Sequence, residues 1–178
     1  MEISKTTFEG LFIIKTYFAK DKRGIFNKVY NKDFYKEHNL NTNFEELFYS
    51  ESQKNVIRGM HFQTPPFEHE KLVFVLKGSV IDVVLDIRKN SDKYGKFYEL
   101  KMDSNEGMAI YIPIGFAHGF KSLEDETIIC YLTTKVYDSK HDSGIRFDSF
   151  GYDWQAKNPV VSDKDKNLIV FDEFKSPF

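Results

Sequence analysis

Short runs of apolar residues, separated by turn residues, cover most of the chain, and no long segment repeats its apolar positions with a helical period. Four of these runs are rich in β-branched and aromatic residues and predict strands, at residues 10–17, 71–76, 79–86 and 127–132. Lys77 and Gly78 predict a tight turn between two of them. Residues 107–113 predict a further strand that ends at Pro113, because proline cannot donate a hydrogen bond to a sheet.

Helix signals are few. Residues 31–39 predict one short helix with Asn31 as its cap, and the segment from Ser162 onward predicts one or two further turns. Neither a repeat nor a linker divides the sequence. Many short strands at close spacing favour a sandwich or barrel, so we expect one all-β domain over residues 1–178 with a few short helices.

Composition narrows the class of protein. The 178 residues carry a net charge of −2, with 41% hydrophobic and 29% charged positions, which is ordinary for a globular domain. This charge gives no basic field, so we expect neither nucleic acid nor a membrane as a partner. The N-terminal residues lack the apolar core of a signal peptide, and no run reaches the ~18–20 apolar residues of a membrane span. We therefore expect a cytoplasmic protein whose single cysteine, Cys130, is a packed thiol.

Two segments resemble the paired motifs of the cupin superfamily, which implies a jelly-roll β-barrel. The first runs from Gly59 through His61 and Gln63 to Lys71, and the second ends at His118. A metal-binding cupin has histidine at the position of Gln63 and glutamate at the position of Lys71. Because a lysine ammonium has no lone pair for a metal, we expect neither a metal nor another cofactor. Two histidines and a lysine inside a barrel favour proton transfer instead.

Distinctive blocks of sequence lie at residues 21–24, 56–63, 71–73, 82–88, 111–120 and 162–165. Together, and in this order over nearly the whole chain, they resemble the dTDP-4-dehydrorhamnose 3,5-epimerase family. The resemblance implies an epimerase that inverts C3, C5 or both on a nucleotide-linked 4-keto-6-deoxy sugar, which is a precursor of surface polysaccharide. It also implies a homodimer in which N-terminal strands are exchanged.

The chemistry of such a reaction fits the residues that match the family. A ketone at C4 acidifies the C–H bonds at C3 and C5, so the enzyme needs a base, a group that stabilises the enolate and an acid on the opposite face. By resemblance, His61 is the base, Asp165 orients it and Tyr131 is the proton donor. Lys71 and His118 are expected to face the C4 oxygen, with Lys71 also lowering the pKa of Tyr131.

Other matching positions are expected to bind the substrate. Arg23 and Arg58 correspond to diphosphate-binding residues, because a guanidinium suits paired phosphate oxygens. In a dimer, Arg23 would serve the neighbouring subunit. Tyr137 is a sugar contact by resemblance, and Gln63 and Phe26 are further substrate-binding candidates.

The positions that read the nucleotide base depart from the family pattern. The family has Glu, Gln and Asn where this chain has Lys28, Glu46 and Phe48. The replacements at Lys28 and Glu46 change both the charge and the hydrogen-bonding groups that face the base, while Phe48 offers a stacking face. The sequence therefore leaves GDP, CDP or UDP open as the carrier, and a 6-deoxyheptose as the sugar.

Other functions also remain open. A metal cupin, such as a dioxygenase or sugar isomerase, is disfavoured by Gln63 and Lys71. A nucleotide-sugar binding protein without activity would have no need of the acid–base residues. A sugar 3,4-ketoisomerase would move the carbonyl instead of inverting a centre. Outside the matching blocks, His38 and His141 are interpreted as surface residues, and the role of His69 is left undecided.

Overall fold

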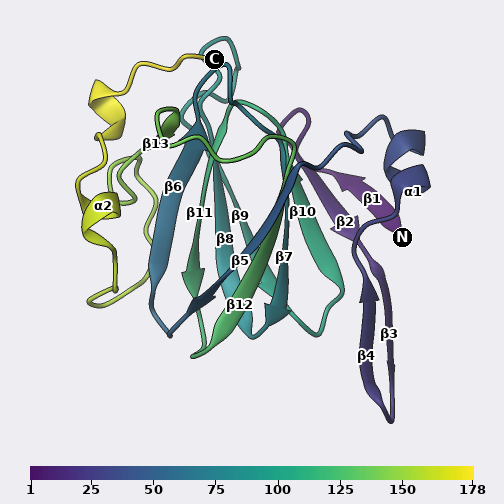
Figure 1. Ribbon diagram of the computed structural model, residues 1–178. Coiled ribbons are helices and arrows are strands. Elements are labelled where there is room, and N and C mark those ends of the chain that lie inside the picture. Colours follow the sequence, from purple (N-terminus) through teal and green to yellow (C-terminus); the bar gives the residue numbers. More distant parts are fainter.

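Two antiparallel sheets packed face to face form the body of the protein in the computed structural model, which describes all residues 1–178 (Figure 1). The six-stranded sheet has the order β1 (Glu2–Lys5), β2 (Phe12–Lys15), β10 (Met108–Ile112), β7 (Lys71–Lys77), β12 (Thr127–Thr133) and β5 (Glu46–Ser52). The five-stranded sheet has the order β13 (Asp142–Gly144), β6 (Ile57–Gln63), β11 (Phe116–Ser122), β8 (Ser79–Asp86) and β9 (Phe97–Asp103). The expected all-β jelly-roll fold is confirmed.

A separate hairpin extends away from the two sheets (Figure 1). It consists of β3 (Tyr17–Asp21) and β4 (Gly24–Lys28), which pair only with each other. The sequence pattern predicted one strand over residues 10–17, and this prediction was wrong in its extent. The run is divided at Thr16, because residues up to Lys15 pair with β10 and residues from Tyr17 onward pair with β4 instead.

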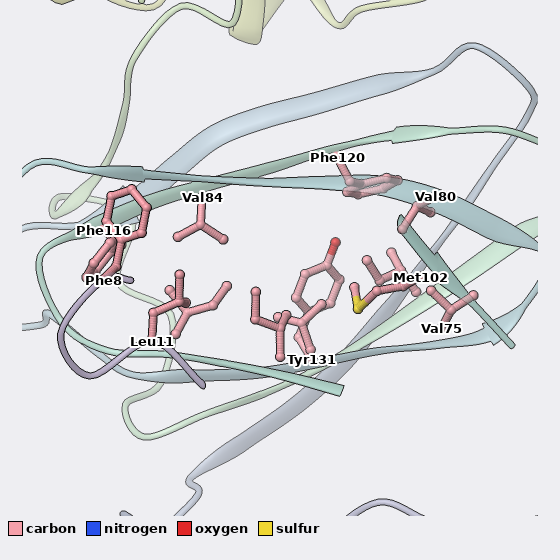
Figure 2. Packing of buried hydrophobic residues seen from close by; sticks show 13 residues of the cluster. Phe8, Leu11, Val75, Val80, Val84, Met102, Phe116, Phe120 and Tyr131 are labelled. Atoms are coloured by element: carbon pink, nitrogen blue, oxygen red, sulfur yellow. The ribbon is translucent and has the colours of Figure 1, made fainter. Parts of the chain in front are cut away.

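The alternation of side chains along each strand divides the apolar residues among three layers. The central layer lies between the sheets and includes Val73, Val84 and Ile110. Figure 2 shows that Tyr131 belongs to this layer, with its hydroxyl directed toward the sheet that carries Phe120. The outer layers pack the C-terminal segment against the five-stranded sheet, and the region of α1 (Lys32–Glu37) against the six-stranded one.

The helix signals are confirmed. Asn31 caps α1 by accepting a hydrogen bond from the backbone N–H of Phe34 at 3.0 Å. Ser162 caps α2 (Asp163–Lys166) in the same way, and η1 (Phe171–Glu173) adds one 3₁₀ turn. Cys130 is buried in the outer layer of the six-stranded sheet, as expected for a packed thiol. Neither helix has the length and apolar character that crossing a membrane requires.

Candidate active site

A pocket of about 310 Å³ opens between the two sheets. Most of the residues singled out in the sequence line it, namely Glu46, Arg58, His61, Gln63, Lys71, His118, Tyr131 and Tyr137. Asp165 lies behind His61, to which it is hydrogen bonded. The fold therefore brings residues that are up to 119 positions apart in the sequence into a single site.

Three candidates lie outside the pocket, on the β3–β4 hairpin. The side chain of Arg23 is 84% exposed and is bonded to Asp21 at 2.6 Å. Phe26 is 58% exposed, and the ammonium of Lys28 lies 5.8 Å from the centroid of the Tyr17 ring. Within one chain, these residues do not meet the other candidates.

His61 and Asp165 form a hydrogen-bonded pair on the side of the five-stranded sheet. His61 Nε2 lies 2.7 Å from Asp165 Oδ1, and the backbone N–H of Gly59 donates to Asp165 Oδ2 at 3.2 Å. Burial raises the pKa of Asp165, but the hydrogen bond and charge of His61, with the N–H of Gly59, outweigh burial and lower it below its ordinary value. A neutral imidazole that donates from Nε2 carries its lone pair on Nδ1, so the pair leaves one basic nitrogen available.

Two glycines bring the strands of this wall close together. A Cβ atom on Gly59 would lie 2.5 Å from the Cα of Gly119, and Gly59 has a φ of +129° that favours glycine. His61 and His118 are direct partners in the register of β6 and β11, so their side chains point to the same face of the sheet. Both imidazoles therefore reach the same pocket.

A second histidine–carboxylate pair is fully buried. His118 Nε2 lies 2.7 Å from Asp82 Oδ2, while Asp82 Oδ1 has no hydrogen-bond partner. Sequence reasoning did not identify Asp82 as the partner of His118. The available signal was a carboxylate on a strand that is otherwise apolar, since such a group needs a buried partner.

Lys71 approaches from the six-stranded sheet. Its ammonium is buried and donates to the backbone carbonyl oxygen of His61 at 3.2 Å. Burial lowers the pKa of Lys71 to about 8, although the negative charges of Asp142 and Asp82 raise it in part. The amine therefore changes charge close to neutral pH.

Tyr131 stands on the same wall as Lys71. Its ring stacks on Phe48 with centroids 4.7 Å apart and 13° between the planes, and it meets the ring of His118 edge-on at 6.0 Å. The expectation that Lys71 lowers the pKa of Tyr131 was wrong. Burial dominates and raises the pKa of the phenol, so Tyr131 is neutral and keeps its proton at physiological pH.

Gln63 holds the loops around the pocket. Its side-chain nitrogen donates to the carbonyl oxygens of Phe67 and Val136 at 2.9 and 3.2 Å, and its oxygen accepts from the backbone N–H of Asp138 at 2.7 Å. The same nitrogen lies 3.1 Å from Nδ1 of His69, which lines the pocket. Burial, together with the charge of Lys71, lowers the pKa of His69 to about 3, so this imidazole is neutral.

A chain of polar contacts links the walls of the pocket near Tyr137. Two of its members, Asp142 and Lys164, were not identified from the sequence. The backbone N–H of Tyr137 donates to Glu46 at 3.0 Å, and its hydroxyl donates to Asp142 at 3.2 Å. Lys164 forms an ion pair with Asp142, and both line the pocket. The signal for Lys164 was its position directly before Asp165 in a block that matched the family.

Arg58 is a further cation that lines the pocket. Its Nε donates to the hydroxyl of Ser52 at 3.1 Å, and its Nη2 donates to the carbonyl oxygen of Glu51 at 3.0 Å. These bonds fix the guanidinium against β5. No group of three or more His, Cys, Asp or Glu side chains is arranged to hold a metal ion. The site thus combines acid–base groups with positive charge at its edge.

Known proteins resemble this chain over almost its full length. The family model described as dTDP-4-dehydrorhamnose 3,5-epimerase matches residues 5–173. The protein of that name from Methanothermobacter thermautotrophicus is 38% identical over 168 residues, which are 92% of this chain and 90% of that one.

Solved structures give the same result. The dTDP-4-dehydrorhamnose 3,5-epimerase from Sulfolobus tokodaii aligns with a TM-score of 0.91 and 32% identity, over 99% of both chains. The Bacillus anthracis protein, solved with TDP and PPi bound, aligns with a TM-score of 0.91 and 30% identity, over 95% of this chain and 98% of that one. The chain therefore belongs to the dTDP-4-dehydrorhamnose 3,5-epimerase family.

Proposed function

We propose that this protein epimerises a dTDP-linked 4-keto-6-deoxy sugar at C3 and C5, and so supplies a precursor of surface polysaccharide. The observation that carries the proposal is the arrangement of acid and base. His61, bound to Asp165, comes from the five-stranded sheet, and Tyr131 comes from the facing sheet. Inversion requires a proton to leave one face of a carbon and another to arrive on the opposite face, which two facing walls permit.

His61 acts as the base in this proposal. Nδ1 removes the proton from C3 or C5, and the electron pair of the broken C–H bond moves into the enolate whose oxygen is O4. The imidazole becomes a cation, which the ionised Asp165 stabilises at 2.7 Å. General-base catalysis of this kind typically contributes about 10²–10⁴-fold in rate.

Lys71 and His118 stabilise the enolate oxygen. The Lys71 ammonium is buried between the walls, where a charge interacts more strongly than it does in water. His118 is anchored by Asp82, which fixes the orientation of its ring. Tyr131 then donates its proton to the carbon from the opposite face, and the O–H electron pair remains on a phenolate that solvent reprotonates.

The nucleotide end of the substrate fits the edge of the pocket. Arg58 offers guanidinium donors to the diphosphate, and the exposed ring of Tyr137 offers a stacking surface. The Bacillus anthracis relative with TDP bound supports dTDP as the carrier. The departures Glu46 and Phe48 already have partners within the chain, at the backbone of Tyr137 and the ring of Tyr131, so neither requires a different base.

We further propose that the protein is a homodimer, in the cytoplasm where nucleotide sugars are made, and that the β3–β4 hairpin completes the neighbour's pocket. The hairpin exposes Ile25 and Phe26, and β5 is an outermost strand that exposes Leu47. Exposed apolar residues on a hairpin and on a free sheet edge are the features that strand exchange covers. Arg23 and Phe26 would then reach a site that they do not reach in their own chain.

Subunit mixing tests the dimer. Arg23→Ala and His61→Asn are each expected to be inactive as pure proteins. In a co-expressed mixed dimer, one pocket combines the intact His61 of one chain with the intact Arg23 of the other, so activity returns. A monomer by light scattering, or a mixed dimer without activity, would contradict the exchange.

Deuterium exchange tests the reaction itself. The purified protein is incubated in D₂O with 4-keto-6-deoxyglucose linked to dTDP, GDP or CDP and followed by NMR. Inversion with deuterium at C3 and C5 on the dTDP sugar is the expected result. Deuterium at C3 alone would make it a single-site epimerase, and migration of the carbonyl would make it a ketoisomerase. A preference for GDP or CDP would overturn the assignment of the carrier.

A further inference from the structure

The inward face of β5 contacts the site at successive alternate positions. Glu46 accepts from the backbone of Tyr137, Phe48 stacks on Tyr131, and Ser52 accepts from Arg58. Between them, Ser50 also lines the pocket. Because alternate residues of a strand point to one side, this outermost strand forms a continuous wall behind the residues proposed to handle the proton and the diphosphate.

Phe48 and Tyr131 are direct partners in the register of β5 and β12. Their rings lie 13° from parallel with centroids 4.7 Å apart. Phe48 is nevertheless 43% exposed, on a strand that has a neighbour on only one side. Its one extensive aromatic contact is with Tyr131, so the ring covers the phenol from the side of β5 and restricts how it can turn.

Ser50 is the register partner of Ile129, two residues before Tyr131 on β12, so its side chain lies diagonally beside Tyr131 on the pocket side of the two strands. Its hydroxyl is buried and makes no hydrogen bond of ordinary geometry to any protein group. The Ser50 side chain lowers the pKa of the Tyr131 phenol, although burial raises that pKa by more. A buried hydroxyl without a partner is unfavourable, and it gains a strong acceptor only when the neighbouring phenol loses its proton.

From this geometry, and resting on the proposed function, we infer that Phe48 and Ser50 are positioning residues for the proton donor. Phe48 holds the ring of Tyr131 in line with the carbon that is to be protonated. Ser50 donates a hydrogen bond to the phenolate oxygen after the transfer. In this step the Tyr131 O–H bond breaks and a C–H bond forms. The enolate electron pair becomes that bond, and the negative charge moves to the phenolate beside Ser50.

Removal of the substrate proton and delivery of a proton to the opposite face are separate processes in this proposal. Removal of the substrate proton by His61 requires neither Phe48 nor Ser50, whereas delivery of a proton to the opposite face requires both. A variant of either residue should therefore continue to exchange protons with D₂O from the face of the base. Its inversion should slow, so the ratio of exchange to inversion is the quantity to measure.

The experiment uses the full-length protein with the dTDP-linked 4-keto-6-deoxy sugar in D₂O. Phe48→Leu and Ser50→Ala are expected to exchange deuterium within about threefold of the wild-type rate and to invert at least about tenfold more slowly, as for a weakened general acid. Phe48→Tyr and Ser50→Thr, which keep the ring and the hydroxyl, should restore inversion. The matched control is Phe97→Leu, an exposed aromatic residue on the outermost strand of the other sheet, and it should leave both rates unchanged.

The outcomes distinguish this inference from the function on which it rests. If Phe48→Leu and Ser50→Ala invert normally, or lose exchange and inversion equally, the positioning role is wrong while the epimerase remains. If the wild-type protein itself neither exchanges nor inverts, the proposed function fails and the inference fails with it. Thermal unfolding of each variant shows whether it is folded. If Phe48→Leu or Ser50→Ala does not fold, Phe48→Tyr and Ser50→Thr still test whether the ring and the hydroxyl support inversion.

Discussion

The ammonium of Lys71 donates a hydrogen bond to the backbone carbonyl oxygen of His61 at 3.2 Å. Lys71 begins β7 of the six-stranded sheet, and His61 lies on β6 of the five-stranded sheet, so the bond joins the two walls inside the pocket. It also fixes the cation next to the proposed base. An enolate formed by His61 would therefore develop its charge beside a donor that is already in position.

The buried amine of Lys71 should lower stability at neutral pH. Its pKa falls from 10.5 to about 8, so between these values the unfolded chain binds a proton that the folded chain lacks. The free energy of unfolding consequently rises with pH over this range. Lys71→Met should be more stable than wild type at pH 7 by about 1–3 kcal/mol and should lose this pH dependence.

Thermal unfolding between pH 7 and pH 10 measures both effects, with the exposed Lys101→Met as the control. The same titration predicts that wild-type epimerisation declines above pH ~8, as Lys71 loses the charge that stabilises the enolate. Lys71→Met should be nearly inactive at every pH. A variant that is less stable than wild type at pH 7 would contradict the burial argument.

His61→Asn should abolish both deuterium exchange and inversion while the protein stays folded. The amide keeps a donor toward Asp165 but has no nitrogen lone pair with which to remove a proton. The loss expected for a general base is about 10²–10⁴-fold, measured by NMR as the initial rate of exchange at C3 and C5. His38→Asn is the matched control, because His38 is an exposed residue outside the pocket.

Most residues at the centre of the site were predictable from sequence, because His61, Lys71 and His118 lie inside blocks with a distinctive order. His61, Lys71, His118 and Tyr131 occupy strands whose alternation also places them inward, so motif and periodicity agree. The strand over residues 10–17 was less predictable. Its apolar run continues through Thr16, and the division there comes from a change of pairing partner, from β10 to β4, which the run itself does not show.

Other features depend on contacts between segments far apart in the sequence. Asp142 and Lys164 lie 22 positions apart and meet only because β13 and α2 pack beside the same pocket. The pKa of Tyr131 was predicted in the wrong direction, because a nearby lysine was weighed and the depth of burial was not. How deeply a residue is buried depends on how the two sheets pack together, and the pattern of residues in one strand does not show that packing.

Gly119→Ala should destabilise the fold, because β6 and β11 leave no room for a side chain at this position. A Cβ atom there would lie 2.7 Å from the carbonyl oxygen of Arg58 and 2.7 Å from the sulfur of Met60. Overpacking of this kind costs about 1–3 kcal/mol. The thermal midpoint should fall by several degrees in calorimetry, and epimerase activity should fall with it because His118 is the neighbouring residue. An unchanged midpoint would contradict the close approach of the two strands.

Tyr131→Phe separates the two halves of the proposed reaction. The base and its partner Asp165 remain intact, so His61 should still remove the substrate proton and return deuterium to the same face in D₂O. Inversion should fall by about 10²-fold or more, because the ring keeps its stacking on Phe48 but has no proton to donate. Tyr98→Phe, at the edge of the same apolar layer, is the control and should invert normally. Normal inversion by Tyr131→Phe would mean that another group or a water molecule delivers the proton.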